Sequence, residues 1–371
     1  MDTRWRRMVQ SGRLLCALVD ARLRARPILL SHLVTCRCPC RCQTCLWRGL
    51  MHEEMTADQI AHFYRDAVAV GMVVNSIWGG EPLVREDLPD ILRASRTAGL
   101  VTVLITSGWR FHERFDEIVP WPDLIIFSLD LPSPEHDSSR GMPGLYDNVE
   151  RAIQRIRERA GGPRVAVNSV ISRLNAHVVP GLVKWAAARS VPIYLHPIET
   201  SRPGGDAQGT VSKEPLAVAD GDLAKLFQRL IALKAAGYPV ANSYPYLRTF
   251  SHGKQPYRCH ARKVCLQLWP NGDLVDCLSR GRAVVNVLKS PLPEVLSRPE
   301  IRKLRLMPVD CHSCNNANVI DTSYVWELRI ESILSLIRAH LGRGNRPGRG
   351  LSGVVKDDPP ETSSCSAVSG R

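Results

Sequence analysis

The segment TCRCPCRCQTC, from Thr35 to Cys45, decides how the rest of this chain is interpreted. Within it, Cys38, Cys42 and Cys45 have the spacing C-x3-C-x2-C. Three thiolates so close in sequence converge only if the backbone loops around something that they bind together. A [4Fe–4S] cluster normally takes four thiolate ligands, so three of them leave one iron open. The segment therefore predicts a cluster loop with one iron free for a substrate or cofactor.

Only one register of the segment gives this spacing. A register from Cys36 through Cys40 would need a third cysteine at Gln43, so Cys36 and Cys40 fall outside the pattern. The alternative interpretation is a zinc knuckle or a reducible disulfide loop. Zinc sites of this kind usually pair two C-x2-C or C-x2-H halves, and no second half lies nearby.

With this spacing, the segment resembles the cluster signature of the radical SAM (S-adenosylmethionine) enzymes, in their SPASM/Twitch branch. The flanking residues Thr35, Arg37 and Arg41 agree with it, whereas Thr44 stands where the family usually has an aromatic residue. The resemblance implies that the open iron binds SAM and that an electron from the cluster yields a 5′-deoxyadenosyl radical. The catalytic cluster ligands that it implies are Cys38, Cys42 and Cys45.

The composition is that of a globular chain with metal sites. It has 371 residues, 44% of them hydrophobic and 23% charged. Ten of its twelve cysteines fall in two groups, at 36–45 and 259–314, which favours metal sites in a reducing compartment. The start MDTRWRRMVQ lacks the features of a secretory signal, and no run approaches the roughly 18 apolar residues of a membrane span. We therefore expect a cytoplasmic protein.

The net charge of +13 is partly local to the first residues. Residues 1–26 carry seven arginines against Asp2 and Asp20, and their apolar residues recur at near-helical spacing. This pattern predicts a basic amphipathic helix, which either packs outside the domain or touches an anionic membrane surface or an acidic partner. Nucleic-acid binding is not expected, because no stripe of Lys and Arg is interleaved with aromatic residues.

Between Pro27 and Pro197, short apolar runs typical of strands alternate with helical stretches. Six such repeats predict an α/β core with a parallel sheet, which carries its chemistry at the carboxyl ends of its strands. The resemblance implies a partial (β/α)6 TIM-like barrel over residues 27–200. The expected strands lie in 28–35, 73–78, 101–106, 123–130, 164–171 and 191–197.

The remaining chain divides into three parts. Residues 201–250 are predicted to be a Gly/Pro-rich loop or linker followed by a helix. Residues 251–342 form a small Cys-rich α+β extension, which the resemblance identifies as a Twitch/SPASM-like auxiliary cluster region. Residues 343–371 contain too little apolar material to fold and are predicted to be disordered.

Two further motifs follow strands of the expected core. The segment WGGEP, from Trp78 to Pro82, resembles the family's SAM amino-group site, which implies cofactor-binding roles for Gly79, Gly80 and Glu81. Ser128 and Arg140 are spaced as in a family pattern whose serine and arginine contact the SAM carboxylate, a group that suits the arginine fork. The alternative for this second pair is a strand-end serine and a surface arginine.

The second cysteine group resembles the opening of a Twitch/SPASM extension. Pro270 to Asp273 predicts a hairpin turn that brings cysteines together. The resemblance implies one auxiliary [4Fe–4S] cluster, and the alternative is a structural zinc on the same thiolates. The expected auxiliary ligands are Cys259, Cys277, Cys311 and Cys314, with Cys265 as the alternative ligand.

Together these patterns favour a radical SAM enzyme, oxidoreductase-like, that modifies an unreactive C–H bond of a peptide or small molecule. The resemblance implies an electron donor such as flavodoxin or ferredoxin. Two alternatives stay open. One is a radical SAM enzyme acting on a lipid, with residues 1–26 as a peripheral membrane contact. The other is a non-catalytic iron–sulfur or zinc protein that binds nucleic acid.

Overall fold

A nine-stranded sheet, in the order β11-β10-β9-β1-β2-β3-β4-β5-β6, organises the chain. The computed structural model describes residues 12, 16–24, 26–203, 210–277, 282–307 and 311–341. Strands β1 to β6 are parallel to one another, and β9 is parallel to β1. Strand β10 is antiparallel to both of its neighbours, β9 and β11. The strands are β1 (Leu29–Leu33), β2 (Val74–Trp78), β3 (Val101–Thr106), β4 (Leu124–Ser128), β5 (Arg164–Ile171), β6 (Ile193–Pro197), β9 (Cys265–Leu268), β10 (Asp273–Val275) and β11 (Ala283–Asn286).

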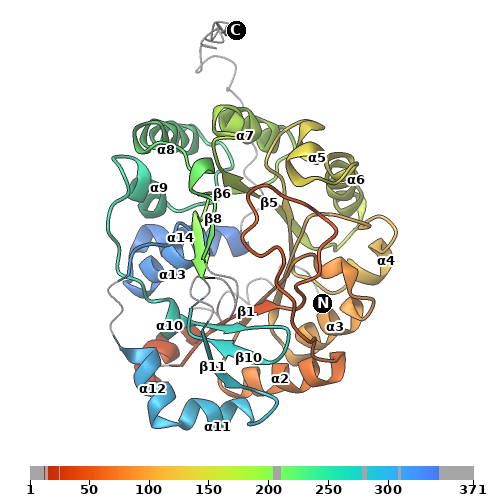
Figure 1. Cartoon of the computed structure of the whole chain (residues 1–371), viewed down its shortest axis with the longest axis vertical. Helices are drawn as coiled ribbons and strands as arrows, with labels where there is room; N and C mark the ends of the chain where they lie inside the picture. Colours follow the sequence, from red (N-terminus) through yellow and green to blue (C-terminus); the bar gives the residue numbers. More distant parts are fainter. Residues whose placement is uncertain are drawn as a thin grey trace, which may run out of the picture.

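Helices follow the first five parallel strands and lie around the outside of the sheet (Figure 1). Local sequence sets their ends: Thr56 and Gln59 form a capping box at the start of α2, and Gly99 ends α3 in the left-handed conformation. The predicted α/β core with a parallel sheet is confirmed. Its helices are α2 (Ala57–Ala69), η1 (Pro82–Val84), α3 (Leu88–Ala98), α4 (Phe115–Ile118), α5 (Glu135–Arg140), α6 (Leu145–Glu158), η2 (Ala176–Val178) and α7 (Val179–Ala188).

The two faces of the sheet pack differently. Alternate strand residues such as Leu30, Ile77 and Phe127 are fully buried in the main core with the outer helices. Each such side chain contributes roughly 1.5–3 kcal/mol when buried. The other face forms a separate small cluster around Val74 and Val101, against which α14 (Ile330–Leu341) packs. This inner face is therefore closed near the amino ends of the strands, while the carboxyl ends carry the loops.

The C-terminal part adds strands to the same sheet. Strand β9 pairs in parallel with β1, Leu29 opposite Cys265, and the predicted Pro270–Asp273 turn connects β9 to β10. Gly272 has a φ of 87° there, which favours glycine. The hairpin thus completes the edge of β1, whose peptide groups would otherwise lack partners. Around it lie α8 (Asp220–Ala235), α9 (Tyr244–Phe250), α10 (Ala261–Val264), α11 (Leu292–Ser297), α12 (Pro299–Leu306) and α13 (Ala317–Trp326).

Three expected segments differ from the structure or lie partly outside it. The expected loop after Thr200 contains a short hairpin of β7 (Ser201–Pro203) and β8 (Thr210–Ser212), then η3 (Glu214–Leu216). Residues 16–24 of the expected first helix are helical, and the expected disordered tail, 343–371, lies outside the described residues. Among the residues that the structure describes, no helix combines the length and the apolar character needed to cross a bilayer.

Candidate active site and second cysteine site

The cysteine loop leaves the carboxyl end of β1 and crosses toward α5 (Figure 1). Two backbone hydrogen bonds hold it there: the Arg41 amide donates to the Arg140 carbonyl at 2.8 Å, and the Gln43 amide to the Ser139 carbonyl at 3.3 Å. The loop therefore lies where parallel sheets carry their chemistry, and it contacts Arg140, one of the two residues predicted to seat a carboxylate.

Gly79 and Gly80 let the next strand end dock directly on the cysteine loop. The Gly80 amide donates to the Thr35 carbonyl at 2.7 Å, and the Glu81 amide to the Arg37 carbonyl at 2.9 Å. A Cβ on Gly79 would lie 2.7 Å from the Thr35 carbonyl oxygen, and one on Gly80 only 2.3 Å from that of Arg37. Both positions thus require glycine for the loop to close.

The thiols of this loop lie close together. A hydrogen bond with Cys40 lowers the pKa of Cys38 and raises that of Cys40 to about 12. Cys40 also interacts with Cys42, and its sulfur lies 3.8 Å from Ser107 Oγ. Burial raises the pKa of Cys45, with a further contribution from the Cys42 thiol. The three predicted ligands are therefore neighbours, and Cys40, which the spacing excludes, is packed among them.

The Glu81 side chain is fully buried and accepts four hydrogen bonds from the protein. One oxygen accepts hydrogen bonds from Thr106 Oγ1 at 2.6 Å and from the Leu83 amide at 3.0 Å. The other oxygen accepts from the Ser107 amide at 2.7 Å and from Ser107 Oγ at 2.6 Å. Burial raises the pKa of Glu81, and these hydrogen bonds oppose the rise. The carboxylate therefore ties the Gly-Gly segment to the end of β3. The family motif gave no sign of these partners.

Arg140 ends α5, its side chain is 12% exposed, and Asp130 holds it. Its Nε and Nη2 lie 2.9 and 2.8 Å from one Asp130 oxygen, and the other oxygen accepts from the Val170 amide at 3.1 Å. Burial lowers the pKa of Arg140, but Asp130 and the thiols of Cys42 and Cys40 raise it above its ordinary value. Arg140 is thus a fixed cation beside the cysteine loop.

Ser128 lies half-buried at the last position of β4, two residues before Asp130. Asp130 received no role in the sequence analysis, although it belongs to the same motif. It links the two predicted carboxylate-binding positions, since it follows Ser128 in the chain and holds the Arg140 side chain. The sequence shows only that Asp130 lies two residues after Ser128 and ten before Arg140, and its contact with Arg140 comes from the fold.

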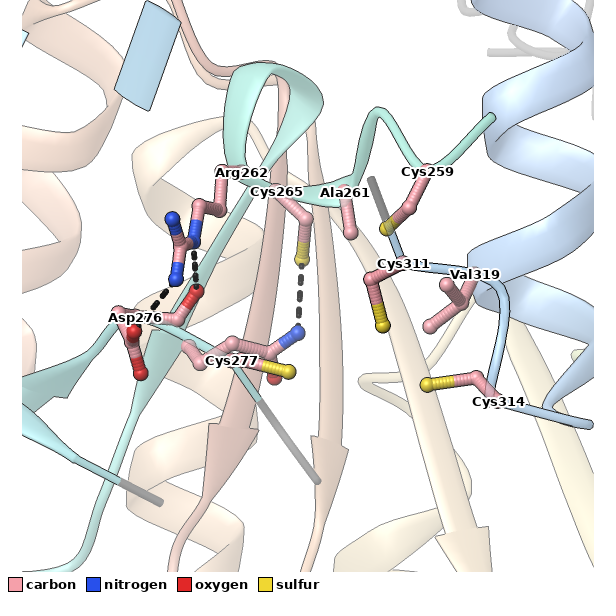
Figure 2. A pocket seen from close by; sticks show the side chains of 10 residues that line it. Cys259, Ala261, Arg262, Cys265, Asp276, Cys277, Cys311, Cys314 and Val319 are labelled. Atoms are coloured by element: carbon pink, nitrogen blue, oxygen red, sulfur yellow. Dashed lines mark hydrogen bonds and ion pairs between the residues drawn. The ribbon is translucent and has the colours of Figure 1, made fainter. Parts of the chain in front are cut away.

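All five cysteines of the second group line one cavity at the edge of the sheet. Figure 2 shows the thiols of Cys277, Cys311 and Cys314 directed into the same space, with that of Cys259 above them. Burial raises the pKa of Cys259, and Cys277 and Cys311 raise it further. Residues distant in sequence, on both sides of α11 and α12, thus meet at one site.

Cys265 stands beside this group. Burial raises its pKa to about 12, and its sulfur lies 3.6 Å from Gln267 Nε2 and 3.3 Å from the Leu266 carbonyl. Arg262 and Asp276, joined at 2.6 Å, border the same cavity (Figure 2). The sequence analysis assigned no part to Gln267 or Arg262.

The donor set of the second cavity fits an iron–sulfur or zinc group. Soft thiolates bind both, and two buried oxygens at the cavity, Gln267 Oε1 and Asp276 Oδ1, have no hydrogen-bond partner within the described part of the chain. In the same described ranges, no three His, Cys, Asp or Glu side chains are close enough to share a single metal ion.

Comparison with known proteins decides the nature of the core. Residues 33–185 match the family model of the Radical SAM superfamily. The chain contains a radical SAM domain. That domain spans the cysteine loop, Gly79 to Glu81, Ser128 and Arg140, whereas the second cysteine group lies beyond it.

Similar curated proteins are enzymes that carry this domain. The chain is 23% identical over 301 residues to a PqqA peptide cyclase of Xanthomonas euvesicatoria, a match that covers 76% of this chain and 78% of the relative. It is 31% identical over 157 residues to an AdoMet-dependent heme synthase of Methanosarcina barkeri, a match that covers 40% of this chain and 44% of the relative. The radical SAM domain and these relatives together show that the chain is an enzyme.

Solved structures share the fold beyond the domain. The structure of Streptococcus suis SuiB bound to S-adenosylmethionine matches with a TM-score of 0.61 and 16% identity, over 80% of this chain and 72% of SuiB. The structure of anSMEcpe with bound AdoMet and a peptide matches with a TM-score of 0.59 and 16% identity, over 84% of this chain and 99% of anSMEcpe. At this identity the likeness shows a common fold.

Proposed function

We propose that this enzyme reductively cleaves SAM at a [4Fe–4S] cluster and uses the resulting radical to modify a C–H bond of a peptide. The observation that carries the proposal is the closed cysteine loop. Its thiols lie together, Gly79 and Gly80 pack against its backbone, and Arg140, whose carbonyl accepts from the Arg41 amide, is a cation beside it. This arrangement supplies three cluster ligands and a carboxylate-binding group at one end of the sheet.

Each part of the loop has a role in this proposal. Cys38, Cys42 and Cys45 hold the cluster. A cluster held there would supply the electron for reductive cleavage of SAM and so the radical chemistry that the proposal requires. Arg140, together with Ser128, orients the SAM carboxylate, and an arginine with Nη1 still free of Asp130 is suited to this task.

Glu81 is assigned a positioning role in the same site. Its carboxylate already accepts from Thr106, Ser107 and Leu83, so we expect it to act by fixing the Gly79–Gly80 backbone against the loop. The backbone of this segment, with its carbonyl groups, is then the partner of the SAM amino group. The motif implied a direct contact between Glu81 and the SAM amino group, and the present proposal replaces it with a contact from the backbone.

The second cysteine cavity is proposed to hold one auxiliary [4Fe–4S] cluster. Its ligands in this proposal are Cys259, Cys277, Cys311 and Cys314. Cys277 and Cys311 raise the pKa of Cys259, and the thiols of Cys277, Cys311 and Cys314 are directed into one space (Figure 2). Cys265 remains outside, held by Gln267. Arg262, paired with Asp276, borders the same cavity.

A peptide is the proposed substrate class. The PqqA peptide cyclases are named for a peptide, and SuiB, whose structure bound to its precursor peptide SuiA matches with a TM-score of 0.60 and 17% identity, binds one as well. The proposal includes a low-potential electron donor such as flavodoxin or ferredoxin.

The test is anaerobic incubation of reconstituted protein with SAM and dithionite, followed by measurement of 5′-deoxyadenosine. Wild-type protein should form it, the Cys38→Ala/Cys42→Ala/Cys45→Ala variant should not, and the matched control Cys36→Ser should retain it. Undiminished product from the triple variant would refute the assignment. For the substrate class, any short peptide that is found encoded beside the gene should change in mass when it is co-expressed with the enzyme, and an unchanged mass would argue against that peptide as substrate.

A further inference from the structure

Large apolar side chains are exposed mainly at one place on the described surface. Five of the nine such residues lie on the helix at 16–24 and on the junction of α13 with α14. Single exposed apolar residues are ordinary, but a group of them marks an interaction site. We call this group the basal patch, and it consists of Val19 (61% exposed), Leu23 (81%), Leu328 (57%), Ile330 (71%) and Leu334 (43%).

The helix at 16–24 and α13–α14 are packed against one another. Ala17 and Leu18 join a small cluster that includes Trp326, the last residue of α13, and the Arg22 guanidinium lies 5.7 Å from the centre of the Trp326 ring. Ala17 and Leu336 of α14 also share the inner cluster near the starts of β2 and β3. The members of the basal patch therefore lie on neighbouring elements.

Helical spacing directs the patch away from the core. Val19 and Leu23 are four residues apart, as are Ile330 and Leu334, so each pair lies on one face of its helix. The opposite faces of the two helices pack against the protein, since Ala21 and Ser332 are buried. Each helix thus has an inward face that packs and an outward face whose apolar side chains are largely exposed.

Cations surround the basal patch and exceed the carboxylates beside them. The pKa of Lys263 is lowered by burial and then by Arg258 and Arg22, which shows that these three cations are close together. Three carboxylates on or next to the same elements are paired with an arginine: Asp20 with Arg24 at 2.8 Å, Glu327 with Arg329 at 3.1 Å and Glu331 with Arg248 at 2.7 Å. Asp321 of α13 instead accepts hydrogen bonds from Ser243. Glu327 also lies 3.4 Å from His260.

We propose that the basal patch docks this enzyme on an anionic phospholipid surface. Apolar side chains of this length reach the acyl boundary, and the surrounding cations approach lipid phosphates. A symmetric contact with a second copy would place the same cations opposite one another, which opposes dimerisation through this face. The arginines of residues 1–26 add positive charge in the adjoining sequence.

The position of the patch leaves the catalytic end open. The inner cluster that α14 and Ala17 complete lies at the amino ends of β2 and β3, whereas the cysteine loop follows the carboxyl end of β1. Docking by the basal patch therefore turns the cysteine loop toward the aqueous phase. The proposal does not rest on the assigned chemistry, so failure of one leaves the other standing.

The experiment is co-sedimentation of the full reconstituted chain with vesicles of phosphatidylcholine alone or with added phosphatidylglycerol. We expect binding to the anionic vesicles only, and weaker binding when sodium chloride is added. The Leu23→Glu/Ile330→Glu variant should bind at least roughly tenfold more weakly. The matched control, Met51→Glu/Leu174→Glu, changes exposed apolar residues elsewhere and should bind as the wild type does.

Two results would overturn the proposal. One is equal binding to both kinds of vesicle, or anionic binding that the Leu23→Glu/Ile330→Glu variant retains. The other is an oligomer in light scattering that this variant dissociates while wild-type protein ignores vesicles, because the patch would then be a protein interface. Circular dichroism and iron content of the variants, matched to wild type, show that the fold is intact.

Discussion

At the scale of single residues, Glu81 connects the motif with the fold. Its carboxylate is buried and holds the end of β3 through Thr106 and Ser107, while its backbone amide holds the cysteine loop through Arg37. A motif identifies such a residue but not its partners, because the partners come from a strand that is separate in sequence.

Replacement of Glu81 should therefore affect stability as well as cofactor binding. In Glu81→Ala, the buried amides of Leu83 and Ser107 lose their acceptors, which should lower the free energy of unfolding by about 3 kcal/mol and weaken SAM binding. Urea denaturation and calorimetric titration measure the two effects. Glu113→Ala, at an exposed position, is the control. Unchanged stability with lost SAM affinity would instead identify Glu81 as a direct contact.

At the scale of elements, local patterns predicted the core and missed its edge. The six apolar runs correctly predicted strands β1 to β6, because buried parallel strands are continuous apolar segments. The pairing of β9 with β1 joins Cys265 to Leu29 across more than half of the chain, and no local signal carries such a register. The same holds for Asp130, whose role appears only once α5 folds back on β4.

The contact between α13 and α9 should make stability depend on pH. Burial raises the pKa of Asp321 to about 6, while hydrogen bonds from Ser243 and the Lys234 charge oppose the rise. The folded chain thus holds this proton more tightly than the unfolded chain does. The stabilisation is complete below the ordinary pKa near 3.8 and is lost as the pH rises through about 6.

Chemical denaturation at a series of pH values measures this effect. The free energy of unfolding should fall by up to about 3 kcal/mol across that window in wild type. Asp321→Asn should flatten the fall, and Asp222→Asn, at an exposed position in α8, should leave it unchanged. An identical pH profile for Asp321→Asn and wild type would contradict the assignment.

At the scale of the whole molecule, the account places two cysteine sites on one sheet. The first follows the carboxyl end of β1, and the second borders the added strand β9. The sequence predicted both groups from their clustering, excluded Cys40 by the spacing and left Cys265 as an alternative ligand. The structure adds the surroundings of these two thiols, which are Ser107 for Cys40 and Gln267 for Cys265.

Iron content tests this division. With about four irons in each cube, wild-type protein should hold about eight, and Cys277→Ser should hold about four. Cys265→Ser, the matched control within the same cavity, should keep about eight. Loss of iron from Cys265→Ser but not from Cys259→Ser would show that Cys265, and not Cys259, is a ligand of the second cluster. One tightly held zinc in place of the second cube would favour the structural-zinc interpretation.

The central claim is that the Cys38, Cys42 and Cys45 loop holds a cluster whose open iron binds SAM. The most direct measurement is the electron paramagnetic resonance spectrum of the reduced protein with and without SAM. We predict that SAM changes the spectrum of wild type and of Cys265→Ser, and leaves that of the Cys38→Ala/Cys42→Ala/Cys45→Ala variant unchanged. A wild-type spectrum that does not respond to SAM, or an equal response in the triple variant, would contradict the account.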